Sequence, residues 1–152
     1  MNRLKFTLKA WPAVAAATIG LCWATQTVAG LFGVELPDQQ NIDVVRRCAG
    51  WNATFLALCL QVVVVLPAVE EAVFRLPTRW LRHPAWWALS SALFSAAHYV
   101  AQPFPDSAFL ALFFFGLAQC WLYRRTGRLW CAMLNHALFN LTNLVLLFVL
   151  PE

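Results

Sequence analysis

Long apolar runs separated by short polar links dominate the pattern of this chain. A helix needs about 20 residues to cross roughly 30 Å of hydrocarbon, and five runs are candidates. They are Ala10–Phe32, Cys48–Trp80, Ala85–Val100, Ser107–Tyr123 and Trp130–Leu150. The second run is too long for one straight span and the third and fourth are short, so the pattern predicts tilts and kinks. Pro67 and Pro77 are the expected kink sites, because proline interrupts the hydrogen bonding of a helix.

The composition agrees with a membrane protein. The 152 residues are 61% hydrophobic and 12% charged, whereas soluble domains average about 25% charged. No linker, repeat or low-complexity stretch divides the chain. We therefore expect an all-α fold, a polytopic bundle of about five transmembrane helices, with residues 1–152 forming a single domain.

The positive charges are distributed unevenly between the links. If the N-terminus is cytoplasmic, nine basic residues fall on the cytoplasmic side and two on the other side, which is a strong positive-inside bias. The nine are Arg3, Lys5, Lys9, Arg75, Arg79, Arg82, Arg124, Arg125 and Arg128, and the two are Arg46 and Arg47. This distribution predicts an integral membrane protein with a cytoplasmic N-terminus and basic links that contact lipid headgroups. We expect the membrane to be a bacterial inner membrane. Because no basic face stands apart from the membrane flanks, we expect no nucleic-acid partner.

Two adjacent acids, Glu70 and Glu71, follow a run that is otherwise almost entirely apolar. An acid at membrane depth costs roughly 2.5–3.5 kcal/mol on insertion scales, and packing alone does not require it. The pair therefore indicates a functional site within the membrane.

Other polar residues are expected at the same depth. Counted from the turn near His83–Pro84, the two acids lie roughly 18–20 Å along one helix and His98 about 21 Å along the next. Counted from Arg128, His136 and Asn140 lie about 12 and 18 Å along the last helix, four residues apart on one helix face. The spacing thus brings groups from three helices together near the middle of the membrane.

The two acids are expected to differ in role, because adjacent residues of a helix point about 100° apart. Glu71 precedes Arg75 by four residues, the favourable order for an ion pair, so we expect Glu71 to be structural. Glu70 lacks such a partner and is the candidate general base. Simpler interpretations exist: His98 as a core histidine, His136 and Asn140 as interhelical hydrogen-bond partners. The run 113–115, three phenylalanines, is interpreted as lipid-facing.

Three motifs carry a family resemblance. Glu70-Glu71-Ala-Val-Phe-Arg75, Phe94-Ser-Ala-Ala-His98 and His136-Ala-Leu-Phe-Asn140 occur in this order within apolar runs. Together they resemble the CAAX protease and bacteriocin-processing (CPBP, or ABI) family of intramembrane proteases, over roughly residues 60–148. The chain departs from the first motif at Leu76, where the family commonly has glycine.

The resemblance implies an intramembrane endopeptidase that hydrolyses a membrane-anchored or lipid-tethered substrate, such as a C-terminal sorting signal or a CAAX-like end. Glu70 and His98 would activate water, while His136 and Asn140 would stabilise the oxyanion and Glu71 and Arg75 would support them. Glu70, His98 and His136 could also ligate zinc, with water in the fourth position. We favour metal-free glutamate chemistry and expect no cofactor.

Two other functions remain open at this stage. A non-catalytic bacteriocin-immunity or scaffold protein could keep the same fold, although it would have no use for Glu70. A small proton-coupled transporter could use acids and histidines as a relay. Transporters usually contain inverted repeats, and none is visible here.

Overall fold

A computed structural model describes residues 2–37, 40–50, 52–81, 83–100 and 106–149, with the side chains of residues 40–43 left out. Most of these residues are helical, and no strand occurs among them. The all-α prediction is therefore confirmed. The elements in order are α1 (Arg3–Leu31), α2 (Gln40–Arg47), α3 (Ala53–Leu60), the π-helix η1 (Gln61–Val65), α4 (Leu66–Phe74), the 3-10 helix η2 (Leu76–Arg79), α5 (Pro84–Ala97), α6 (Phe109–Thr126) and α7 (Leu129–Val149).

Each of the five predicted runs contains a helical rod. Three rods are long and apolar enough to cross a membrane: α1, the continuous segment Ala53–Phe74, and α7. The other two, α5 and α6, have 14 and 18 residues. The short helix α2 was not predicted, because five of its eight residues are polar and it lies outside the apolar runs.

The second run is remodelled around its two prolines. The π-helix η1 ends two residues before Pro67, and the 3-10 helix η2 contains Pro77. Proline has no amide hydrogen and its ring clashes with the carbonyl four residues back, so a widened turn before it is a common adjustment. The regular helix therefore ends at Phe74, earlier than the predicted Trp80.

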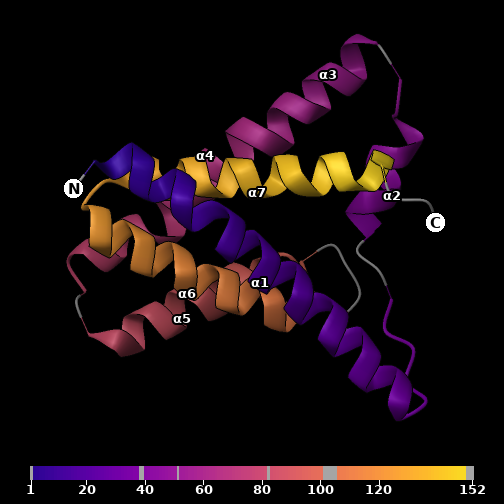
Figure 1. Cartoon of the computed structure of the whole chain (residues 1–152), viewed down its shortest axis with the longest axis horizontal. Coiled ribbons are helices and arrows are strands. Elements are labelled where there is room, and N and C mark those ends of the chain that lie inside the picture. The colour runs from indigo at the N-terminus through magenta and orange to yellow at the C-terminus, as the bar shows by residue number, and fades with distance from the viewer. Residues whose placement is uncertain (1, 38–39, 51, 82, 101–105, 150–152) are drawn as a thin grey trace.

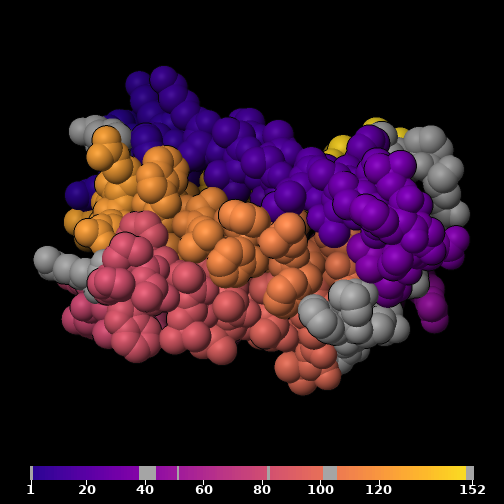
Figure 2. All heavy atoms as spheres, turned by 90° about the horizontal axis from the view of Figure 1, so that it is seen from below, coloured from indigo at the N-terminus to yellow at the C-terminus, as the bar shows by residue number. Residues whose placement is uncertain are grey.

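The helices pack around α6 and α7. Helix α5 lies against α6, α4 lies against α7, and α1 crosses both α6 and α7 (Figure 1). Figure 2 shows α1 running along the body beside the surface formed by α5 and α6. The largest cluster of buried apolar side chains joins α1, α5, α6 and α7; it comprises Ala15, Phe94, Ala108, Leu112, Phe115 and Phe139.

Helix α6 packs tightly against α5 at Gly116. A methyl group placed there would lie 2.9 Å from the Ser91 Cβ and 3.1 Å from an Arg75 guanidinium nitrogen. Only glycine fits this position without displacing its neighbours. At this position α6 therefore lies against Ser91 of α5 and Arg75 at the end of α4.

A tight turn positions α7. Gly127 ends α6 in the left-handed conformation, at φ 67°, and its amide donates to the Tyr123 carbonyl at 2.8 Å. Such a cap favours glycine, which has no Cβ to clash. Helix α7 begins two residues later, so it turns back at once along α6 and carries His136 toward α4.

Candidate active site

Helix α4 places its two acids in different environments. The Glu71 side chain is fully buried, whereas the Glu70 side chain is 23% exposed and lines a large cavity. The helical offset of about 100° between neighbours produces this difference, as the sequence predicts. One acid thus belongs to the protein interior and the other to the cavity wall.

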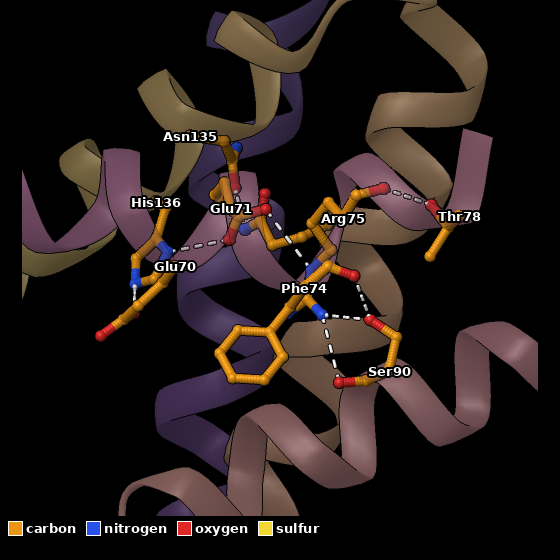
Figure 3. A network of polar contacts seen from close by, with 9 residues as sticks. Glu70, Glu71, Phe74, Arg75, Thr78, Ser90, Asn135 and His136 are labelled. Carbon is orange, nitrogen blue, oxygen red and sulfur yellow. Dashed lines mark hydrogen bonds and ion pairs between the residues drawn. The ribbon is translucent and has the colours of Figure 1, made fainter. Parts of the chain in front are cut away.

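Each carboxylate oxygen of Glu71 contacts a different side chain. Its Oε2 lies 3.4 Å from Nε of Arg75, so the predicted i, i+4 ion pair is present. Its Oε1 lies 2.9 Å from Nδ1 of His136 on α7 (Figure 3). A carboxylate only accepts hydrogen bonds, so Nδ1 of His136 carries a proton and donates it to Glu71.

The fully buried Arg75 is held on several sides. One terminal nitrogen donates to the Ser90 hydroxyl at 2.9 Å, and the guanidinium carbon lies 4.7 Å from the centre of the Phe94 ring. A buried cation is tolerated only when it is paired and hydrogen-bonded. Counting Arg75 among the residues of the cytoplasmic links was therefore wrong, because its guanidinium is buried inside the protein. Arg82, another member of that count, lies outside the described residues.

His136 faces the cavity acid with its second nitrogen. The distance from Nε2 to Glu70 Oε2 is 3.6 Å, longer than a hydrogen bond but within the range of an ion pair. Figure 3 shows the imidazole between the two carboxylates, with Glu71 at one nitrogen and Glu70 at the other. Glu71 thus fixes the ring orientation that presents Nε2 to Glu70.

His98 and Asn140 line the same cavity as Glu70 and His136. Nδ1 of His98 lies 2.9 Å from the Phe94 carbonyl oxygen; it must donate there, so neutral His98 has a basic Nε2. Nδ2 of Asn140 donates to the Val62 carbonyl at 2.9 Å. The structure therefore brings all four predicted site residues to one cavity, which has a volume of about 790 Å³.

Two aromatic residues contribute more than the sequence suggested. The Phe94 ring packs edge-on against both imidazoles, with centroid distances of 4.8 Å to His98 and 5.8 Å to His136. Phe115 is 1% exposed and packs 4.9 Å from His136, so its interpretation as lipid-facing was wrong. Its neighbour Phe114 is exposed; the spacing of Phe115 from Leu112 and Gln119, also buried, was the available signal.

A polar pair lies within the interior near these residues. Gln119 of α6 donates to the Asn135 side-chain oxygen at 2.9 Å, and both side chains are fully buried. Asn135 precedes His136, so this contact fixes the part of α7 from which His136 projects.

The alternative zinc ligands do not form a preorganised ligand set. Among the described residues, no group of three or more His, Cys, Asp or Glu side chains is arranged to hold a metal ion. Nδ1 of His136 is already bound to Glu71, and Nδ1 of His98 to a carbonyl. Each imidazole therefore has only its Nε2 atom to offer to a zinc ion.

Comparison with known proteins identifies the family. The family model described as type II CAAX prenyl endopeptidase Rce1-like matches residues 51–142, more than half of the chain. The chain belongs to the Rce1-like family. No curated protein and no solved structure gives a significant match. The resemblance to the CAAX proteases is thereby confirmed, and the match includes all three motifs.

Membership of the Rce1-like family places this chain among membrane proteases. Together with three helices able to cross a bilayer, it supports an integral membrane peptidase. The acids, imidazoles and amide described above lie within the matched residues.

Proposed function

We propose that the protein is a metal-free intramembrane endopeptidase that uses Glu70 as its general base. The observation that supports this most is the difference between the surroundings of the two acids. The Glu71 carboxylate is paired with Arg75 and His136. Glu70 instead lines the cavity, together with His98, His136 and Asn140. An acid at the wall of a largely apolar cavity is costly for stability, so its presence is better explained by a catalytic role than by packing.

The reaction begins with water in the cavity. Glu70, assisted by the basic Nε2 of His98, takes a proton from the water, and the remaining hydroxide forms a bond to the carbonyl carbon of the scissile peptide. The carbonyl π electrons move to the oxygen, which becomes an oxyanion. The carbon–nitrogen bond then breaks, and the proton held by Glu70 passes to the leaving amine.

His136 and Asn140 stabilise the oxyanion in this scheme. For this role His136 needs a proton on each ring nitrogen: the Nδ1–H is donated to Glu71 and the Nε2–H faces the cavity, while Asn140 supplies an amide N–H. A donor of this kind typically contributes about 10²–10³ in rate. Glu71 acts through His136 and is therefore a positioning residue.

The shape of the cavity favours an apolar, membrane-anchored substrate. The rest of its wall includes some polar side chains but is formed mainly by apolar side chains of α1, α6 and α7, among them Ile19, Leu112 and Leu144. A lipid tether or an apolar helix suits such a wall, as in a CAAX-like end or a C-terminal sorting signal. The lipid bilayer is the other partner, and we place the enzyme in a bacterial inner membrane with a cytoplasmic N-terminus.

The test uses purified protein in lipid nanodiscs and three fluorogenic probes: a farnesylated CAAX peptide, the same peptide without the lipid, and an apolar helix followed by basic residues. Wild-type protein is expected to cleave at least one of the two membrane-anchored probes, to leave the lipid-free peptide intact and to resist chelators. Glu70→Gln should fold normally and lose this cleavage. Normal cleavage by Glu70→Gln would overturn the mechanism, and stoichiometric zinc with chelator sensitivity would overturn its metal-free form.

A second experiment covers substrates that the probes do not resemble. Membranes of cells producing wild-type protein or Glu70→Gln are compared by mass spectrometry of new protein termini. Termini that depend on Glu70 support a protease. Identical sets of termini, together with three uncleaved probes, would favour the non-catalytic scaffold.

A further inference from the structure

The π-helix η1 leaves one backbone carbonyl without a partner from its own helix. The Leu66 amide donates to the Gln61 carbonyl, five residues back, and is thereby lost to Val62. In a π-helix the next donor, to the Val62 carbonyl, would be the amide of residue 67. That residue is proline and has no amide hydrogen.

Asn140 of α7 supplies the missing donor. Its Nδ2 lies 2.9 Å from the Val62 oxygen. Within a bilayer a backbone carbonyl must be satisfied by protein, and a neighbouring helix commonly does so beside a proline. Because a carbonyl only accepts, the contact determines which end of the Asn140 amide faces Val62.

This contact bears on the catalytic role of Asn140. A side-chain amide free to turn by 180° would present either its NH₂ group or its oxygen to the cavity, and the oxygen would repel an oxyanion. One N–H bound to Val62 holds the nitrogen in place and leaves the second N–H available. The other donor of the site, His136, is held in a comparable way by Glu71.

We propose that Pro67 is a positioning residue for the hydrolysis: by removing an amide it frees the Val62 carbonyl, which orients the Asn140 side chain as an oxyanion donor. The catalytic part of this inference rests on the proposed function. The structural part, a coupling between Pro67 and Asn140, stands on the contacts alone.

The experiment is a double-mutant cycle of Pro67→Ala and Asn140→Ala, read by thermal unfolding and by cleavage. In the wild-type background Asn140→Ala leaves the Val62 carbonyl unsatisfied and should lower the melting temperature. Pro67→Ala introduces a backbone amide at position 67 that can satisfy that carbonyl, so in this background Asn140→Ala should lower the melting temperature much less. Pro67→Ala alone should reduce kcat roughly 10- to 100-fold with KM nearly unchanged, because misplaced groups lose rate rather than binding.

Two matched controls isolate the effect. Pro12→Ala changes an exposed proline within α1, far along the chain from the site. Thr142→Ala removes a side-chain hydrogen bond from α7 to its own Leu138 carbonyl. Pro12→Ala should leave the effect of Asn140→Ala intact, and Thr142→Ala should be additive with Pro67→Ala.

The outcomes separate this inference from the proposed function. An equal fall in melting temperature on Asn140→Ala in both backgrounds would overturn the coupling, even if cleavage still required Glu70. Coupling in unfolding without any Glu70-dependent cleavage would refute the catalytic role and leave only a structural contact. Coupling in unfolding together with a non-additive loss of kcat would support the inference in full.

Discussion

At the scale of single residues, the site depends on two adjacent acids whose side chains the helix directs about 100° apart, into different surroundings. Glu71 has both oxygens engaged by cations or N–H donors of the interior, while Glu70 remains at the cavity. This difference could be predicted from the sequence, since the i, i+4 spacing to Arg75 identified the structural acid. The bond from Glu71 to His136 could not be predicted, because it depends on the rotation of α7 about its axis.

Glu71→Gln tests the structural role of that acid. The substitution leaves the buried Arg75 without its ionic partner, and breaking a buried pair by removing one member typically costs about 3–5 kcal/mol. We expect a large fall in the melting temperature of Glu71→Gln, measured in nanodiscs. Glu70→Gln serves as the matched control, since Glu70 is partly exposed and should keep its stability. Equal stability of the two variants would contradict the assigned roles.

At the scale of elements, the rods were predictable and their ends were not. All five apolar runs contain helices, but the run 48–80 is a composite of α3, η1, α4 and η2. Hydropathy identifies a run as apolar without showing where proline diverts the hydrogen bonds. Likewise, the run of three phenylalanines was assigned to lipid as a block, although the helical period buries only Phe115 among the three.

Gly116→Ala tests the close contact of α5 and α6. The added methyl group would lie 2.9 Å from the Ser91 Cβ, so the helices must separate or distort. Overpacking of this kind typically costs about 1–3 kcal/mol, and cleavage should fall because Arg75 adjoins the same contact. Thermal unfolding and cleavage rates measure both effects.

Gly20→Ala is the control for this prediction. Gly20 also lies within a membrane helix, but a Cβ added there meets no atom within 4 Å. Alanine is the better helix former, so this variant should be neutral or slightly more stable. If Gly116→Ala behaved like Gly20→Ala, the tight contact would not constrain the bundle.

At the scale of the whole molecule, the helix order gathers most basic side chains at one end. Figure 1 shows the N-terminus, the α4–α5 link and the α6–α7 link at one end, and the C-terminal ends of α1 and α7 at the other. Lys5, Arg79 and Arg128 are exposed there. By the positive-inside rule we expect this end to face the cytoplasm. The basic pattern was readable in the sequence because links alternate sides whatever the packing.

Whether α5 and α6 cross the bilayer determines whether the protein has five transmembrane helices or three. With 14 residues, α5 is roughly 21 Å long, less than the usual hydrocarbon thickness of about 30 Å. A short helix can still cross if the bilayer thins locally or flanking residues reach the interface. Val100, just beyond α5, is 89% exposed and reports on this directly.

Single cysteines at Glu35, Leu81 and Val100, in a variant without the five native cysteines, test both orientation and crossing in bacterial cells. A membrane-impermeant maleimide should label Glu35→Cys and Val100→Cys in spheroplasts, and Leu81→Cys only after permeabilisation. Labelling of Leu81→Cys alone from outside would invert the orientation. Protection of Val100→Cys both before and after permeabilisation would make α5 and α6 a hairpin that enters the membrane without crossing it.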